Sequence, residues 1–173
     1  MTHDAQDDQS PILLLATRLG ERLAARGWMA ATAESCTGGG ISAAITEIAG
    51  SSAWFDRGFV TYSNAAKQEL LGVQAGTLAR VGAVSEETAG EMARGALQRS
   101  AAQVSVAVTG VAGPGGGSDE KPVGTVCFGF ATRAGVVLAR RHLFTGDRAA
   151  VRRQTVITAL EGLLALAEGQ APR

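Results

Sequence analysis

Several residue types that often carry catalysis or bind metals are scarce in this chain of 173 residues. It has two histidines, and one of them, His3, lies in a polar stretch, so we expect neither a zinc site nor any other bound metal. The two cysteines, Cys36 and Cys127, form no CxxC pair, which is typical of a reducing compartment. No apolar run approaches the ~20 residues of a membrane-spanning helix.

The chain also lacks an excess of charge of either sign. Its 16 basic and 16 acidic residues cancel, so no broad electrostatic field attracts nucleic acid or a membrane surface. Residues 1–10 are acidic and polar, without the basic start and apolar core of a secretory signal. We therefore expect a cytoplasmic protein with neither a nucleic-acid nor a membrane partner.

Apolar residues make up 46% of the chain, a normal share for a globular protein. We expect a disordered tail over 1–9 and one folded domain over 10–168. Helical and strand patterns alternate, which predicts a three-layer α/β/α sandwich. Two late strands, 123–131 and 135–143, are joined by a tight turn, so the predicted sheet is mixed rather than fully parallel. The other expected strands are 28–33, 54–62 and 103–109, and the expected helices are 10–26, 41–48, 64–71, 85–100 and a last one capped by Asp147.

Two glycine-rich loops, 34–40 and 109–117, each follow a predicted strand directly. Ligands of such sheets bind beyond the carboxyl ends of the strands, so we expect the loops to meet at one edge. Glycine lets backbone N–H groups approach a ligand closely. The loops contain no P-loop motif, and tight turns alone would also explain their glycines.

Two cations are candidates for the site. Lys67 could lose its proton near neutral pH if it is partly desolvated, and its amine could then act as a base. Arg148 follows Gly146 and Asp147 at a predicted helix start, where it could clamp a phosphate. Exposure to solvent is the alternative for both side chains, because lysine and arginine are mostly surface residues.

Hydroxyl and thiol groups near these loops are candidate nucleophiles. Ser52 lies just before the strand that leads to Lys67, and Ser35 lies on the first glycine loop; either serine could instead cap the next segment. Cys36 could be activated at a helix start, but a small buried residue is the alternative. Thr109 and Tyr62 are candidate hydrogen-bond partners.

Five motifs in fixed order resemble the CinA C-terminal domain family: AESCTGG, GSSAWFDRGFVTYSNAAK, GAVSEET, TGVAGPGGGSDEKPVGTV and TGDRAAVRR. The resemblance runs from about residue 12 to residue 166. It implies hydrolysis of nicotinamide mononucleotide to nicotinic acid mononucleotide and ammonia, as part of pyridine nucleotide recycling. It also implies a serine/lysine mechanism that needs neither a metal nor a cofactor.

The resemblance implies roles for particular residues. Ser52 would be the nucleophile and Lys67 its base, with Tyr62, Ser35 and Thr109 supporting the site. Ser35 stays open as the alternative nucleophile, because both serines fall within matching motifs. The residues expected to bind the nucleotide are Thr37, Gly38, Gly39, Gly113, Gly115 and Arg148. Gly115 stands where the family often has a polar residue.

A nucleotide-binding regulatory module without turnover is the rival interpretation. It would bind the nucleotide without releasing ammonia. Phosphate transfer fits poorly, because the chain has no P-loop lysine and no obvious acidic cluster to hold a metal. We also expect a homodimer, since two-fold assemblies are the commonest oligomers.

Overall fold

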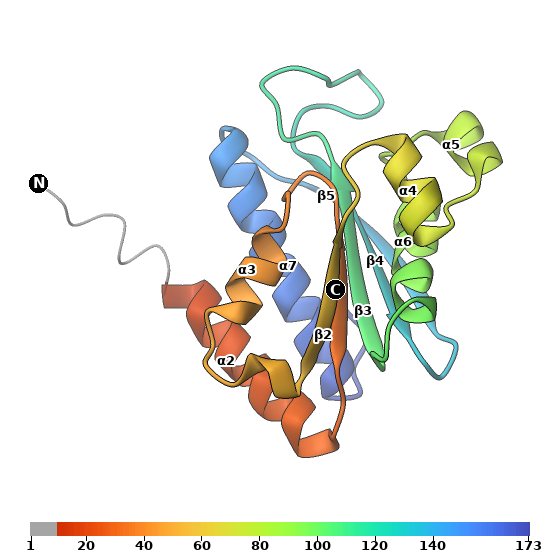
Figure 1. Cartoon of the computed structure of the whole chain (residues 1–173). Coiled ribbons are helices and arrows are strands. Elements are labelled where there is room, and N and C mark those ends of the chain that lie inside the picture. The colour runs from red at the N-terminus through yellow and green to blue at the C-terminus, as the bar shows by residue number, and fades with distance from the viewer. Residues whose placement is uncertain (1–9) are drawn as a thin grey trace, which may run out of the picture.

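A mixed sheet of five strands, in the order β2-β1-β3-β4-β5, separates two layers of helices (Figure 1). This computed structural model describes residues 10–173, so the tail expected over 1–9 lies outside the described residues. The layering is the α/β/α sandwich that the alternating patterns predict.

The strands run in two directions, and the change of direction is what positions the site. The strand β1 pairs in parallel with β2 and β3, while β3–β4 and β4–β5 pair antiparallel. The carboxyl ends of β2, β1 and β3 therefore meet at one edge of the sheet. The strand bounds are β1 Ala30–Glu34, β2 Phe55–Val60, β3 Val104–Gly110, β4 Thr125–Thr132 and β5 Val137–Leu143.

The helices fall on opposite faces of the sheet (Figure 1). One face is covered by α2 (Ser10–Arg26), α3 (Gly40–Thr46) and α7 (Arg148–Ala167). The other is covered by α4 (Asn64–Leu71), α5 (Ala75–Val81) and α6 (Glu86–Gln98). No helix within residues 10–173 is long and apolar enough to cross a membrane.

Short polar side chains start three of the helices. Asp147 caps α7 by accepting a hydrogen bond from Ala150 N at 2.9 Å, as its position in the sequence predicts. Ser63 and Ser85 cap α4 and α6 in the same way. The helix α5 was not predicted, and it has no side-chain cap that could have marked its start.

Alternation along β4 divides the core between the two faces. Phe128 and Phe130 belong to the apolar cluster beneath α7, whereas Ala131 belongs to the cluster beneath α6. Packing against α7 is close, because a Cβ on Gly162 would lie 2.1 Å from the ring of Phe130. The core thus holds α7 tightly against the sheet, with its first residues at the edge where the parallel strands end.

Candidate active site

The carboxyl ends of the three parallel strands bring together residues that are far apart in the sequence. Ser35 directly follows β1, Thr109 lies near the end of β3, and Lys67 is carried back to this edge by α4, which follows β2. All three line a pocket of about 200 Å³. The two glycine-rich loops meet here as expected, since Ala112 of the second loop lines the same pocket.

The amine of Lys67 is the centre of this pocket. Its Nζ donates to Ser35 Oγ at 3.0 Å, to the carbonyl oxygen of Thr61 at 2.8 Å and to that of Tyr62 at 3.2 Å. The side chain is 1% exposed, so the alternative of a solvated surface lysine does not apply. Three fixed contacts hold the amine against the serine hydroxyl.

The surroundings of Lys67 favour the uncharged amine. Burial lowers the pKa of Lys67 from its ordinary value, because desolvation disfavours the ammonium. Among residues 10–173 no carboxylate lies within 4.0 Å of its Nζ. The nearby thiol of Cys36 has its pKa raised to about 11 by burial, so it stays neutral and supplies no countercharge. A neutral thiol is also a poor nucleophile, which argues against a catalytic role for Cys36.

The contacts of Lys67 decide where an uncharged amine directs its lone pair. A neutral amine has two N–H groups and one lone pair. The carbonyl oxygens of Thr61 and Tyr62 can only accept, so they take the two N–H groups. The hydroxyl of Ser35 is the remaining partner and it can donate. The arrangement therefore suits transfer of the Ser35 proton to Lys67.

Glu34 holds the loop that carries Ser35. This carboxylate is 0% exposed and accepts hydrogen bonds from Thr37 Oγ1 at 2.7 Å, Ile41 N at 2.8 Å, and Ser42 N and Oγ at 2.9 and 2.8 Å. These bonds fix both the loop and the start of α3. Our sequence reasoning missed Glu34, although a lone acid at the end of a small apolar strand was a usable signal.

The mouth of the pocket is bridged by Arg148. Its Nη1 donates to the carbonyl oxygen of Gly113 at 2.9 Å and its Nη2 to the hydroxyl of Tyr62 at 3.4 Å. Tyr62 is 64% exposed, so its ring lies at the rim while its backbone carbonyl contacts Lys67. Arg148 thus lies beside Ser35 and Lys67, and it also lines the neighbouring pocket; its role in substrate binding stays a prediction.

Two predicted site residues have hydroxyls that are already engaged. Thr109 lines the pocket, but its Oγ1 donates to the carbonyl oxygen of Ala83 at 2.8 Å and so holds the opposite wall. Thr37 is 1% exposed and its hydroxyl bonds to Glu34. Both side chains shape the site from within the protein rather than presenting a free hydroxyl.

The glycines expected to bind the nucleotide differ in position. Gly38 and Gly39 have positive φ values of 59° and 103° and make the turn that leads into α3. Gly113 contributes its carbonyl oxygen to Arg148. Gly115 is exposed in the loop and lines neither the pocket at Ser35 nor its neighbour.

Ser52 lies away from this group. It is exposed in the short 3-10 helix η1 (Ser51–Ala53), which precedes β2, whereas Lys67 follows the carboxyl end of β2. The whole strand therefore separates the two residues, and the structure does not form the expected pairing of Ser52 with Lys67. The serine that contacts Lys67 is Ser35, the alternative nucleophile.

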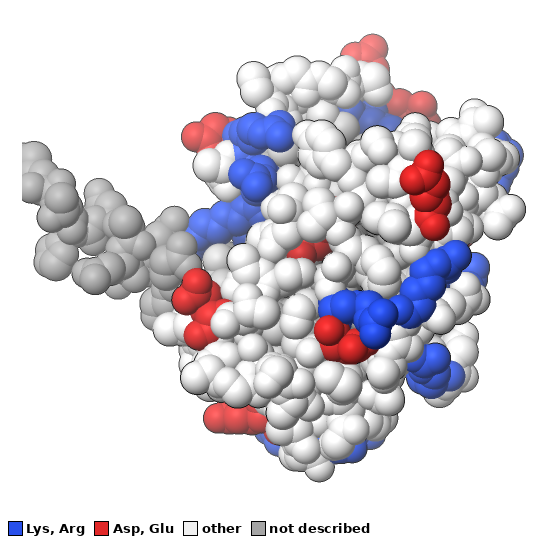
Figure 2. Space-filling model, in the orientation of Figure 1, with Lys and Arg blue, Asp and Glu red and all other residues white. Residues whose placement is uncertain are grey.

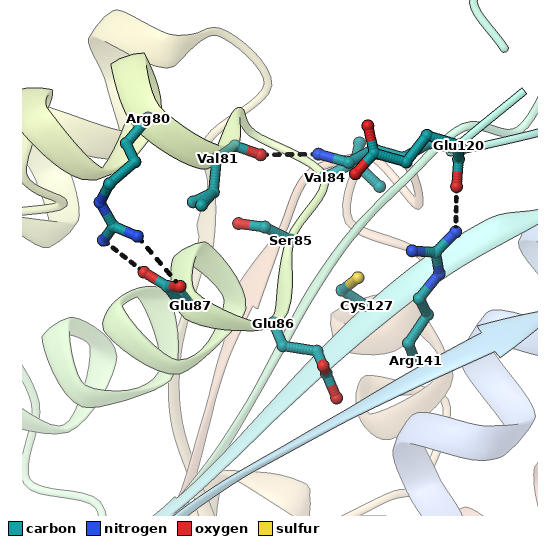
Figure 3. A pocket seen from close by; sticks show the side chains of 10 residues that line it. Arg80, Val81, Val84, Ser85, Glu86, Glu87, Glu120, Cys127 and Arg141 are labelled. Carbon is teal, nitrogen blue, oxygen red and sulfur yellow. Dashed lines mark hydrogen bonds and ion pairs between the residues drawn. The ribbon is translucent and has the colours of Figure 1, made fainter. Parts of the chain in front are cut away.

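A second pocket, of about 330 Å³, shares the wall residue Val84 with the first (Figure 3). Its three cationic side chains are engaged, since Arg80 pairs with Glu87, Lys121 donates to the carbonyl oxygen of Val81 and Arg141 donates to that of Glu120. Its thiol, Cys127, has its pKa raised to about 11 by burial. The pocket contains no nucleophile paired with a base, so we assign the candidate active site to the smaller pocket at Lys67.

Comparison with known proteins agrees with the motifs along the chain. Residues 13–167 match the family described as the CinA C-terminal domain. A protein of Enterobacter agglomerans named nicotinamide-nucleotide amidohydrolase PncC is 59% identical over 150 residues, which are 87% of this chain and 92% of that protein. The protein of the same name from Escherichia coli K12 is 56% identical over 154 residues, which are 89% and 93% of the two chains.

A solved structure shares the fold as well as the sequence. The competence/damage inducible protein CihA from Agrobacterium tumefaciens superimposes with a TM-score of 0.89 at 55% sequence identity, covering 90% of this chain and 95% of that one. Because the family match spans most of the described residues and these relatives are covered almost completely, this chain belongs to the CinA C-terminal domain family.

Proposed function

We propose that this protein is an amidohydrolase that converts nicotinamide mononucleotide to nicotinic acid mononucleotide and ammonia, and so takes part in pyridine nucleotide recycling. The relatives named nicotinamide-nucleotide amidohydrolase support the reaction and the substrate. The observation that carries the chemistry is the 3.0 Å contact between the buried amine of Lys67 and Ser35 Oγ.

The first half of the reaction forms an ester on Ser35. Uncharged Lys67 takes the hydroxyl proton as Ser35 Oγ attacks the carboxamide carbon, which gives a tetrahedral intermediate. The ammonium of Lys67 then returns this proton to the departing nitrogen. The C–N bond breaks, ammonia leaves, and Ser35 holds the acyl group with Lys67 uncharged again.

The second half reverses these roles with water. Lys67 accepts a proton from a water molecule that attacks the ester carbon. The bond to Ser35 Oγ then breaks, and the proton passes from Lys67 back to the serine oxygen. The products are the carboxylic acid and the starting form of the enzyme, so one lysine serves both halves.

Backbone groups of the Ser35 loop are the candidate donors to the oxyanion. Among residues 10–173 the N–H group of Thr37 donates to no acceptor, and that of Cys36 contacts only the thiol of its own residue. They follow the nucleophile directly in the chain, and Glu34 fixes their loop. Backbone donors that are held in place beforehand stabilise a developing negative charge strongly.

The test is ammonia release from nicotinamide mononucleotide by three variants. Ser35→Ala removes the nucleophile and should abolish turnover, and Lys67→Ala removes the base and should lower kcat by about 10²–10⁴-fold. Ser52→Ala is the matched control and should keep wild-type turnover, because Ser52 lies beyond the other end of β2.

The same assay separates the rival interpretations. Loss of activity in Ser52→Ala with full activity in Ser35→Ala would return the nucleophile to Ser52. Thermal stabilisation of the wild-type protein by the nucleotide without any ammonia would instead indicate a nucleotide-binding regulatory module.

A further inference from the structure

The geometry points to a phosphate-binding subsite beside the catalytic pocket, in which Arg152 contacts the phosphate and also acts as a positioning residue for the Ser35 loop. This inference rests on the proposed function, because it assigns a place to the phosphate-bearing end of the substrate. It concerns a pocket of about 660 Å³ between the 111–124 loop and the start of α7.

The two pockets adjoin each other. Both are lined by Ala112 and Arg148. Pockets that enclose small molecules usually measure about 300–1,000 Å³. The catalytic pocket, at about 200 Å³, is below that range and suits the reacting carboxamide and its ring. The remainder of a mononucleotide needs a neighbouring space, and the pocket at α7 provides it.

The charged residues of the pocket at α7 favour an anion. Two arginines, Arg148 and Arg152, line it together with a single acidic residue, Asp147. Asp147 is engaged as the cap of α7, where its Oδ1 accepts from Ala150 N. Figure 2 shows basic side chains gathered over the N-terminal half of α7. A phosphate monoester is the chemical class that two guanidinium groups in one small pocket recognise best.

Arg152 reaches from α7 to the loop that follows Ser35. Its Nε donates to the carbonyl oxygen of Cys36 and its Nη2 to that of Thr37, each at 3.1 Å. Its Nη1 has no partner among the described residues, so this group can donate to a ligand in the pocket. One side chain can therefore hold the loop and a phosphate oxygen at the same time.

The loop contacts of Arg152 orient a candidate oxyanion donor. In a planar trans peptide the C=O and the following N–H point in opposite directions. By fixing the carbonyl of Cys36, Arg152 also fixes the direction of the Thr37 N–H, which donates to no acceptor within residues 10–173. A phosphate bound to Arg152 would hold this guanidinium still and so steady the Thr37 N–H.

Equilibrium binding tests the phosphate contact apart from turnover. The inactive Ser35→Ala protein is titrated by calorimetry with nicotinamide mononucleotide and with nicotinamide riboside, which lacks the phosphate. Adding Arg152→Gln should weaken mononucleotide binding by about 10- to 100-fold, as expected for a lost charge-assisted hydrogen bond, and leave riboside binding unchanged. Adding Arg94→Gln on α6 is the control and should change neither affinity.

Kinetics of the otherwise intact enzyme test the positioning role. Arg152→Gln should lower kcat for the riboside, which has no phosphate to contact, whereas the loss in affinity should appear for the mononucleotide alone. A variant that is less stable to heat yet keeps wild-type kcat would show a purely structural arginine and overturn the positioning role.

The binding data test the phosphate subsite independently of the turnover data. Equal affinity of the Ser35→Ala protein for the two ligands, or an equal loss for both on Arg152→Gln, would overturn the phosphate subsite. Absence of ammonia release from the wild-type protein would defeat the proposed function, while a phosphate preference that depends on Arg152 would still uphold the subsite.

Discussion

Lys67 shows how the environment of a residue changes its chemistry. The side chain is 1% exposed, and its amine contacts two carbonyl oxygens and one hydroxyl instead of water. Carbonyl dipoles replace part of the lost hydration but bring no full negative charge. Desolvation is therefore the larger effect, and the pKa of Lys67 moves down.

The first prediction concerns the pH dependence of turnover. The lowered pKa of Lys67 places the change from ammonium to amine below the ordinary value of 10.5. The active form is the amine, so kcat/KM should fall as pH drops through that lowered pKa and level off above it. Initial rates of ammonia release between about pH 6 and pH 10 would reveal the inflection.

Lys67→Arg is the control for this profile. Its guanidinium stays protonated throughout the range, so the variant should be nearly inactive at every pH. A flat profile for the wild-type enzyme, or substantial activity in Lys67→Arg, would contradict a lysine base.

Single residues also show what the sequence could reveal about the site. Lys67 was predictable only as a candidate, because a lone lysine among hydroxyls and glycines suggests a base while the sequence pattern equally allows an exposed side chain. The choice between Ser35 and Ser52 was not, since motif order does not say which end of β2 a residue occupies. Arg152 was predictable as part of a basic cluster with Arg148 that could hold an anion. Its bonds to the Ser35 loop were not, because they join positions that are 116 and 115 apart in the sequence and no local pattern marks them.

The close packing of α7 on the sheet predicts how a larger side chain at Gly162 would change the stability of the protein. Gly162 faces the ring of Phe130, and a Cβ there would lie 2.1 Å from a ring carbon. Helix propensity alone would make Gly162→Ala stabilising by about 1 kcal/mol. Overpacking typically costs about 1–3 kcal/mol, so we expect net destabilisation, measured as a lower denaturant midpoint.

Gly76 of α5 is the matched control. It is also a helical glycine, and a Cβ there would meet nothing within 4 Å. Gly76→Ala should therefore raise stability by about 0.5–1 kcal/mol. A stabilising Gly162→Ala would mean that Phe130 moves aside at little cost.

Elements with a local signal were predictable, and the one without it was missed. Asp147 at the start of α7 and the hairpin of β4 and β5 follow from capping and turn residues. The expected strand 54–62 overran β2, which ends at Val60 because the chain turns there toward Lys67. The helix α5 has no capping side chain, so the sequence gave no reason to separate it from its loop.

Each face of the sheet covers a buried thiol, so the opening of either face can be measured by thiol labelling. Cys36 is 6% exposed and Cys127 is 1% exposed, and burial raises the pKa of each thiol to about 11. Thiolates are the reactive form. In native buffer near neutral pH, a thiol-reactive disulfide reagent should therefore label neither cysteine quickly.

Denaturant should increase the labelling rate of both cysteines, because it unfolds the whole molecule. Unfolding exposes both thiols and returns their pKa to the ordinary 9.0, so labelling should accelerate steeply through the unfolding transition. The two cysteines should then react together, as single-cysteine variants would show. Rapid labelling of Cys127 in the native protein would mean that the sheet face under α6 opens independently.

Assembly into a homodimer stays a prediction.

The order of the sheet has a consequence for how this scaffold could be altered. The proposed reacting pair, Ser35 after β1 and Lys67 on α4, is encoded within one continuous stretch of the chain. The walls of the adjoining pocket come from much later in the chain, from the 111–124 loop and α7. A library confined to the 111–124 loop could therefore seek new amide substrates while Ser35, Lys67 and the contacts of Arg152 with the Ser35 loop stay unchanged.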